Sequence, residues 1–257
     1  MKVRPEDPSQ LSDFSLLSFD CFGTLIDWEL GIYEALKPLN DRLPDSNPIK
    51  NNKDLTIKAF DDIEVSLCAS RPGLKYSTLL EETYVRLVDS LSLPAPPKSE
   101  VESIGASISK WPLFPDTIDA LHRLHKHYKL VILSNVDRES FDQVLSKAFA
   151  DVKYDAVYVA GDIGSYKPDP NNFHYLFKHV KEQLSVEKSK ILHTAEGLKA
   201  DHVPAAQLGL TSAWIQRDHS TGPGTKMDQV KDKVAFTWKF NTLGEMADDV
   251  ERNAAKA

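Results

Sequence analysis

The stretch SLLSFDCFGTLID, Ser15–Asp27, joins a short apolar run to a polar turn. Its first part, Ser15–Phe19, has the length and composition of a buried β-strand. Such a strand carries Asp20 at its carboxyl end, and Gly23 permits a tight turn of the backbone. Thr24 can form a hydrogen bond from within that turn. Asp20 is therefore a candidate nucleophile, and the competing interpretation is that its carboxylate only caps the turn.

Further apolar runs of strand length follow along the chain. They are Leu130–Leu133, Ala156–Ala160, Ile191–Thr194 and Leu210–Ile215, with a candidate edge strand at Val234–Lys239. Helical patterns such as Thr117–His127 and Asn172–Gln183 alternate with the runs from Leu130 onward. This alternation predicts an α/β fold, a doubly wound parallel sheet whose site lies at the carboxyl ends of its strands.

The interval after the first strand has a different pattern. It shows helical periodicity without a clear strand, and loops are expected at Asn47–Lys53 and Leu93–Lys98. We expect residues 1–29 and 110–257 to form a Rossmann-like α/β core, with residues 30–109 as an inserted helical unit. Met1–Ser12 is polar and is expected to be a disordered lead-in rather than a secretory signal.

Polar side chains also follow the next two apolar runs. Ser134 and Asn135 end the run Leu130–Leu133, where they can cap a helix or help to bind an anion. Lys167 lies beside prolines in a rigid loop after the third run. A loop lysine is usually solvated, but one at the same sheet edge as Asp20 would keep that carboxylate ionised.

The fourth run leads to two acids, Glu196 and Asp201. They can orient Lys167, position water or hold a cation, and the alternative is ordinary acid placement at a helix N-terminus. His193 and His202 nearby are expected to be packed, hydrogen-bonded histidines.

Composition limits the classes of function. The chain has 257 residues, of which 41% are hydrophobic and 27% charged, as in a globular protein. Its formal net charge of −7 argues against nucleic acid as the main partner. No run approaches the roughly 18 apolar residues of a membrane helix. Two cysteines, Cys21 and Cys68, cannot build a disulfide framework, so a reducing, cytoplasmic location is expected.

Four motifs together resemble those of the haloacid dehalogenase superfamily of aspartyl-nucleophile hydrolases. They are FDCFGTL at Phe19–Leu25, LSN at Leu133–Asn135, SYKPDP at Ser165–Pro170 and AEGLKAD at Ala195–Asp201. The resemblance extends from about residue 15 to residue 245, and the helical insert matches the position of the family's cap. It implies that Asp20 forms an ester intermediate that water then hydrolyses.

Phe22 stands where the phosphatases of this superfamily have an aspartate that acts as general acid and base. An aromatic residue there is typical of the L-2-haloacid dehalogenase branch. Glu196 and Leu198 stand where those dehalogenases have serine and asparagine, and Phe173 stands where they have tyrosine.

Longer stretches resemble the azetidine-2-carboxylate hydrolases of the same branch: FDCFGTLIDWE, WPLFPDT, HYKLVILSN, GSYKPDPNNF and ILHTAE. This resemblance implies ring-opening hydrolysis of L-azetidine-2-carboxylate to 2-hydroxy-4-aminobutyrate, which detoxifies a proline analogue. The alternatives are an L-2-haloacid dehalogenase and a magnesium-dependent small-molecule phosphatase.

The resemblance also suggests roles for individual residues. Lys167 stabilises Asp20, Thr24 supports the nucleophile loop, and Asp201 positions Lys167 or activates water. The substrate carboxylate is expected to contact Ser134, Asn135 and the backbone amides near Cys21 and Phe22. A cationic ring nitrogen is expected to pair with Glu196, or with a cap acid such as Asp61 or Asp62.

No metal is expected to be required. Magnesium is the alternative, held by Asp20, the carbonyl of Phe22 and Glu196, because most of the superfamily binds the ion in this way. The expected partner is a small carboxylate substrate, with no nucleic acid and no membrane. The related dehalogenases are commonly dimers, so a homodimer is possible.

Overall fold

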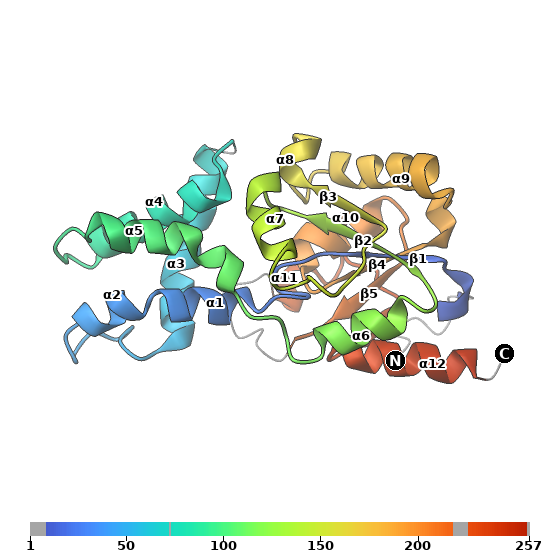
Figure 1. Cartoon of the computed structure of the whole chain (residues 1–257), viewed down its shortest axis with the longest axis horizontal. Helices are drawn as coiled ribbons and strands as arrows, with labels where there is room; N and C mark the ends of the chain where they lie inside the picture. Colours follow the sequence, from blue (N-terminus) through green and yellow to red (C-terminus); the bar gives the residue numbers. More distant parts are fainter. Residues whose placement is uncertain (1–8, 72, 218–225, 256–257) are drawn as a thin grey trace.

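The computed structural model describes residues 9–71, 73–217 and 226–255, and a parallel sheet forms its centre (Figure 1). The strand order is β3-β2-β1-β4-β5-β6, and every neighbouring pair is parallel. The strands are β1 (Leu16–Phe19), β2 (Lys129–Ser134), β3 (Ala156–Val159), β4 (Ile191–Ala195), β5 (Ser212–Ile215) and β6 (Trp238–Phe240). This order confirms the predicted doubly wound α/β fold, and it brings β1, β2 and β4 together at the middle of the sheet.

Helices occupy the sequence between the strands. The described α-helices are α1 (Trp28–Ala35), α2 (Lys37–Arg42), α3 (Lys53–Ser70), α4 (Tyr76–Ser90), α5 (Lys98–Gly105), α6 (Thr117–Leu124), α7 (Arg138–Leu145), α8 (Ala160–Ile163), α9 (Asn171–Leu184), α10 (Val203–Gln207), α11 (Met227–Val230) and α12 (Leu243–Ala254). Shorter turns are η1 (Leu11–Asp13), η2 (Ala106–Lys110), η3 (Lys188–Lys190) and the π-helical turn η4 (Leu198–His202). None of the described helices is both long and apolar enough to span a membrane.

Helices α1 to α5 and the turn η2 lie together beside one end of the sheet (Figure 1). The described elements from Trp28 to Lys110 are all helical. Helix α1 begins where the Asp27 carboxylate accepts a hydrogen bond from the backbone of Leu30, and Asn52 caps α3 through the backbone of Leu55. The division into a core and a cap at residues 29/30 and 109/110 stays a prediction.

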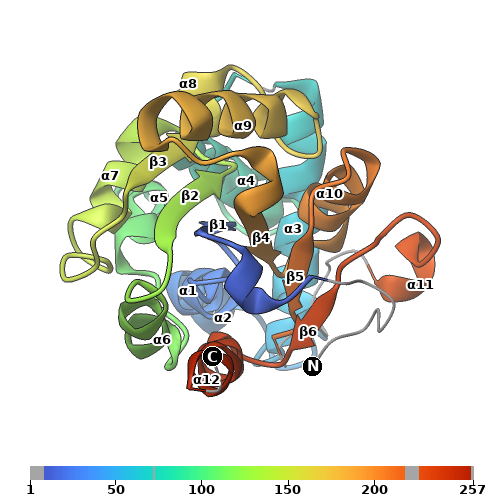
Figure 2. The same ribbon diagram turned by 90° about the vertical axis from the view of Figure 1, so that its right-hand side faces the viewer.

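The two faces of the sheet are covered by different helices (Figure 2). Leu17 and Phe19 point to the face covered by α6, α7 and α12, where the larger hydrophobic cluster lies. Leu16 points to the other face, which packs against α9 and α10. Because side chains alternate along a strand, the apolar run that ends at Phe19 contributes to the hydrophobic clusters on both faces of the sheet.

Two predicted segments differ in the structure. The edge strand β6 begins only at Trp238, because the backbone amide of Val234 bonds to Val230 and closes a turn after α11. Val234 packs against the cluster of Leu198, Trp214 and Val230 rather than extending the sheet. At the other end, residues 1–8 of the predicted disordered lead-in lie outside the described residues. Leu11 is buried in the turn η1, so the prediction of disorder is wrong there.

Candidate active site

Asp20 lies in the turn that follows β1. The Cys21 carbonyl accepts hydrogen bonds from the three backbone amides of residues 24–26, and Gly23 adopts a φ of 89° that favours glycine. The hydroxyl of Thr24 donates to Oδ2 of Asp20 at 2.8 Å and accepts from the backbone amide of Glu196 at 2.9 Å. The turn therefore holds the Asp20 carboxylate in one orientation and ties it to the end of β4.

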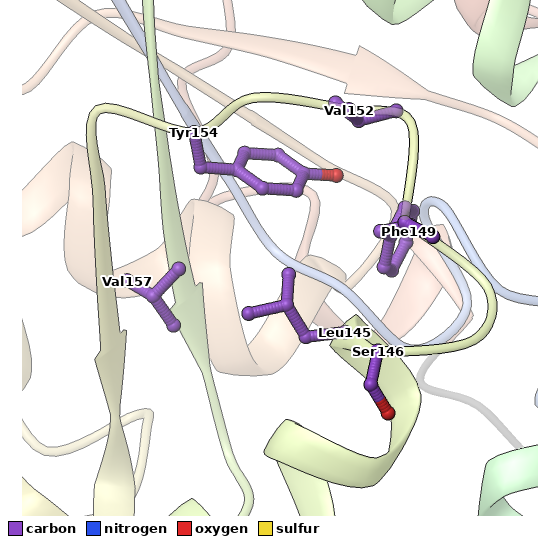
Figure 3. A pocket seen from close by; sticks show the side chains of 7 residues that line it. Leu145, Ser146, Phe149, Val152, Tyr154 and Val157 are labelled. Atoms are coloured by element: carbon purple, nitrogen blue, oxygen red, sulfur yellow. The ribbon is translucent and has the colours of Figure 1, made fainter.

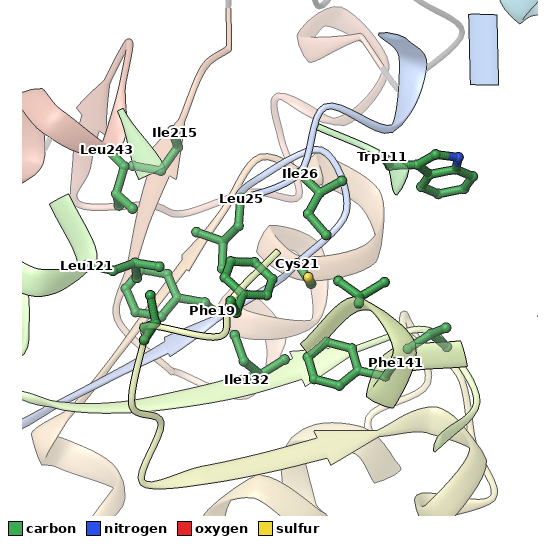
Figure 4. Packing of buried hydrophobic residues seen from close by; sticks show 14 of the residues in the cluster. Phe19, Cys21, Leu25, Ile26, Trp111, Leu121, Ile132, Phe141, Ile215 and Leu243 are labelled. Carbon is green, nitrogen blue, oxygen red and sulfur yellow. The ribbon is translucent and has the colours of Figure 1, made fainter. Parts of the chain in front are cut away.

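The Cys21 side chain lies in the hydrophobic core, near Phe19 and Ile26 (Figure 4). Burial raises the pKa of its thiol well above the ordinary value, and the Asp20 charge acts in the same direction. The thiol is thus a packing group. The proposed contact of the Cys21 and Phe22 amides with a substrate stays a prediction.

Lys167 reaches Asp20 from the loop after β3. Its Nζ lies 2.8 Å from Oδ1 of Asp20, 2.7 Å from Oδ1 of Asp201 and 2.9 Å from the carbonyl oxygen of Leu133. Burial lowers the pKa of Lys167, but the two carboxylates outweigh burial and raise it overall. Lys167 is therefore an ammonium whose three hydrogens are all directed at acceptors.

Burial raises the pKa of Asp20, and Lys167 opposes this rise. We therefore expect Asp20 to take up a proton at a higher pH than an exposed aspartate does, while Lys167 beside it favours the ionised form.

Asn135 anchors the loop that carries Lys167. Its side-chain Nδ2 donates to the Lys167 carbonyl at 2.9 Å, and its Oδ1 accepts from the Lys167 amide at 2.7 Å. The neighbouring Ser134 hydroxyl is buried and has no hydrogen-bond partner among the described residues. The structure thus gives Asn135 a contact with Lys167 that the sequence did not reveal. The predicted contact of Ser134 and Asn135 with a substrate carboxylate stays a prediction.

Asp201 lies on the π-helical turn η4, and its carboxylate is almost fully buried. Burial raises its pKa, but Lys167 and then His193 outweigh burial and lower the pKa of Asp201 to about 2. A Cβ at Gly197 would lie 2.5 Å from Oδ2 of Asp201, so a side chain there would displace the carboxylate. The glycine therefore makes room for the acid that holds Lys167.

The two buried histidines have different surroundings. His193 Nε2 lies 3.0 Å from Oδ1 of Asp201. The ring nitrogens of His202 instead contact the Ser212 hydroxyl and the Ala195 carbonyl, each at 2.9 Å. Burial lowers the pKa of His202 to about 4. His202 is packed as the sequence predicted, whereas His193 also joins the site.

Arg217, just after β5, is a further site residue that the sequence analysis missed. Its Nε and Nη2 donate to the Thr24 carbonyl at 3.1 and 2.6 Å. Its Nη1 lies 2.7 Å from Oδ1 of Asp116, and its guanidinium lies over the Phe114 ring at 4.1 Å. Arg217 therefore holds the turn that carries Asp20 and Thr24. Its place just past a strand end at the same sheet edge was the available signal.

The residues considered for magnesium have other interactions in this structure. Both oxygens of Asp20 already accept hydrogen bonds, one of them from the Lys167 ammonium. Burial, together with the charge of Asp20 and Asp201, raises the pKa of Glu196 to about 7, so its carboxyl is partly protonated near neutral pH. Among the described residues, no three His, Cys, Asp or Glu side chains lie together so as to hold a metal ion. The magnesium alternative, two carboxylates with the Phe22 carbonyl, is a set of a different kind, so it stays a prediction, as does the expectation that no metal is required.

A cavity of about 230 Å³ lies where the helical segment meets the strand ends. Its lining includes Arg71, Leu74 and Tyr76 from the α3–α4 region, and Asn135, Tyr166 and Lys167 from the sheet side. Tyr76 stacks on Phe22 with ring centroids 6.2 Å apart, and Trp111 meets both rings edge-on.

Behind Tyr76 lies an acid that the sequence analysis did not single out. Tyr76 forms a side-chain hydrogen bond with the buried Glu64, and burial raises the pKa of Glu64 to about 7. Asp61, one turn earlier in α3, has its pKa raised to about 6 by burial and by Asp62. Asp62 itself is exposed and pairs with Lys58 at 2.7 Å. Glu64 is thus the acid that forms a hydrogen bond with a residue of the cavity wall, Tyr76.

Another cavity, of about 410 Å³, lies apart from this site, beside the end of α7 (Figure 3). Leu145, Phe149, Val152 and Val157 make most of its surface apolar. The Tyr154 hydroxyl is buried there without a hydrogen-bond partner among the described residues. None of the predicted site residues lines this cavity.

Comparisons with known proteins show the family to which this chain belongs. A family model for haloacid dehalogenase-like hydrolases matches residues 14–194, so the chain belongs to this family of hydrolases. A comparison with curated proteins finds no match.

Several solved structures are similar to this chain over nearly its whole length. The L-2-haloacid dehalogenase PA0810 is 24% identical with a TM-score of 0.70, covering 95% of this chain and 100% of that one. The L-2-haloacid dehalogenase from Xanthobacter autotrophicus is 17% identical with a TM-score of 0.70, covering 93% and 98%. The HAD-hydrolase YfnB from Bacillus subtilis, solved with magnesium, is 17% identical with a TM-score of 0.71, covering 93% and 99%. At these identities the likeness shows a shared fold.

Proposed function

We propose that this hydrolase displaces a substituent from the α-carbon of a small carboxylate through an ester on Asp20. The observation that carries the proposal is the buried contact of the Lys167 ammonium with both Asp20 and Asp201. It provides an oriented carboxylate with a cation beside it. Phe22, two residues after Asp20 in the turn, has no proton to exchange, which disfavours phosphate-ester hydrolysis.

In the first step, a carboxylate oxygen of Asp20 attacks the α-carbon of the substrate. Each Asp20 oxygen accepts one hydrogen bond and keeps a second lone pair for this attack. With L-azetidine-2-carboxylate, the ring C–N bond breaks and its electron pair goes to the protonated nitrogen, which leaves as a tethered neutral amine. Release of ring strain favours the step.

In the second step, water attacks the Asp20 carbonyl carbon of the ester. Lys167, 2.8 Å from Oδ1, stabilises negative charge that develops there and then the returning carboxylate. The bond from the carbonyl carbon to the substrate oxygen breaks, and 2-hydroxy-4-aminobutyrate leaves. The proton released as the carboxylate re-forms balances the proton that the amine takes up. Because Asp201 is enclosed by Lys167 and His193, it acts here by positioning Lys167.

Glu64 supports a cationic substrate for this reaction. Its carboxyl bonds to Tyr76, which lines the cavity beside Lys167. When it is ionised, this carboxylate behind the cavity wall favours a protonated ring nitrogen over a neutral substituent. The longer sequence resemblance to the azetidine-2-carboxylate hydrolases points to the same substrate.

Arg71 favours a second candidate, an L-2-haloacid dehalogenase. Its side chain lines the same cavity, although it also pairs with Glu82. A guanidinium can stabilise a departing halide or a substrate carboxylate. The Xanthobacter autotrophicus enzyme has been solved with chloropropionic acid covalently bound, and a covalent intermediate is what both candidates require.

A competition assay decides between the candidates. The purified protein is incubated without added metal with L-azetidine-2-carboxylate and L-2-chloropropionate, and both hydroxy-acid products are measured. Ring-opened product alone is expected, and lactate alone would favour the dehalogenase.

The assay also has outcomes that contradict the scheme as a whole. Turnover of an aryl phosphate with neither hydroxy acid formed would overturn it, as would full activity of Asp20→Asn. The proposed reaction uses no metal ion, so loss of activity in EDTA that magnesium restores would contradict this part of the proposal.

A further inference from the structure

His193 connects the candidate active site to the central strands. Its Nε2 lies 3.0 Å from Oδ1 of Asp201, and its Nδ1 lies 2.9 Å from the hydroxyl of Ser18. Ser18 on β1 and His193 on β4 stand directly opposite each other in the parallel register. The Phe173 ring meets the imidazole edge-on, with centroids 5.2 Å apart. The imidazole is therefore held on three sides in the interior.

The contact with Asp201 sets where the imidazole carries a proton. An ionised carboxylate only accepts hydrogen bonds, so Nε2 of His193 must be the donor to Asp201. The same oxygen, Oδ1, also accepts from Lys167 at 2.7 Å. Two donors thus fix one carboxylate oxygen, and Lys167 in turn contacts Asp20 at 2.8 Å.

We propose that His193 is a positioning residue of this hydrolase, which acts through Asp201 to hold Lys167 against Asp20. The inference rests on the proposed role of Asp20 and Lys167. Without the Nε2 donor, the Asp201 carboxylate is free to turn about its side-chain bonds. The Lys167 ammonium then loses its fixed distance to Asp20, although Lys167 itself is intact.

A matched pair of variants tests the inference. His193→Leu removes the donor to Asp201, whereas His193→Gln retains an N–H donor at a similar reach. We expect kcat of His193→Leu to fall roughly 10-fold to 100-fold, as misplacement of catalytic groups by about 1 Å does. KM should change much less, because His193 does not line the cavity beside Lys167. His193→Gln should recover most of kcat.

His202 provides the control for a purely structural effect. It is as fully buried as His193, and its hydrogen bonds go to Ser212 and Ala195 rather than to Asp201. His202→Leu is expected to lower the melting temperature yet keep kcat within about threefold of the wild type. An equal loss of kcat in His202→Leu and His193→Leu, or no rescue by His193→Gln, would overturn the proposal.

The kinetics are measured on whichever compound the wild type hydrolyses, among L-azetidine-2-carboxylate, L-2-chloropropionate and an aryl phosphate. Turnover of the aryl phosphate alone would refute the proposed function. It would still test His193, because the Asp20–Lys167 contact is present in the protein whatever the substrate. A kcat in His193→Leu equal to that of the wild type would refute the role of His193.

Discussion

The side-chain amide of Asn135 forms two hydrogen bonds with the backbone of Lys167, at 2.7 and 2.9 Å. One amide group thus fixes both the N–H and the C=O of the residue whose ammonium contacts Asp20. The contact joins the end of β2 to the loop after β3, two segments more than 30 residues apart. The position of Lys167 therefore depends on a side chain from another strand end.

Asn135→Ala should lower kcat strongly, by up to about 100-fold, because Lys167 loses both anchors of its backbone. The unfolding free energy should also fall by roughly 1–3 kcal/mol, as expected when partly buried backbone groups lose their partners. Steady-state kinetics and urea denaturation measure the two effects. Asn172→Ala is the control, since the Asn172 amide bonds to Ser165 and Asp169 in the same loop without touching Lys167. Equal kcat losses in the two variants would contradict the prediction.

Lys167→Met should destabilise the protein by about 3–5 kcal/mol near neutral pH, because it leaves Asp20 and Asp201 as buried carboxylates without their cation. The loss should shrink as the pH falls, since protonation then neutralises these carboxyls. Urea denaturation at pH 7.5 and pH 5 tests this. Lys75→Met removes an exposed ion pair with Glu139 and should leave stability nearly unchanged. A destabilisation by Lys167→Met that does not depend on pH would contradict the prediction that Lys167 neutralises the buried carboxylates of Asp20 and Asp201.

Arg217→Met should lower both stability and activity. It leaves the Asp116 carboxylate and the Thr24 carbonyl without a charged donor, at a cost of roughly 2–4 kcal/mol. Because Thr24 also orients Asp20, kcat should fall more than the change in stability alone would cause. Arg252→Met, which removes an exposed contact with Asp249, should leave kcat unchanged. Wild-type kcat in a folded Arg217→Met protein would show that the Thr24 loop does not need this support.

Glu64→Gln should make stability depend less on pH. The pKa of Glu64 is raised to about 7 in the folded protein from an ordinary value of 4.5, chiefly by burial. Its stabilising contribution is fully present below pH 4.5 and is lost as the pH rises through 7. Relative to the wild type, Glu64→Gln should therefore gain up to about 3 kcal/mol between pH 4.5 and pH 8. Denaturation curves at both pH values measure the stability of Glu64→Gln relative to the wild type. If this relative stability is the same at pH 4.5 and pH 8, titration of Glu64 is not its cause.

The sequence alone determined the sheet and the place of its polar strand ends. Strand periodicity and apolar content are local properties, and parallel strands bring their carboxyl ends to one edge. Asp20, Lys167 and Asp201 could therefore be placed together before any contact was known. The start of β6 and the buried turn at Leu11 could not be predicted in this way. Packing against neighbouring segments decides them, and the local sequence pattern does not.

Only the tertiary structure decided how the site residues support one another. Asn135 turns to the Lys167 backbone, His193 to Asp201, and Arg217 to the Thr24 carbonyl. Each of these contacts depends on strand register or on the packing of segments distant in the chain. The identity of a residue and its sequence neighbours do not show which distant residue its side chain will contact. The folded sheet decides this, because it brings the two segments together.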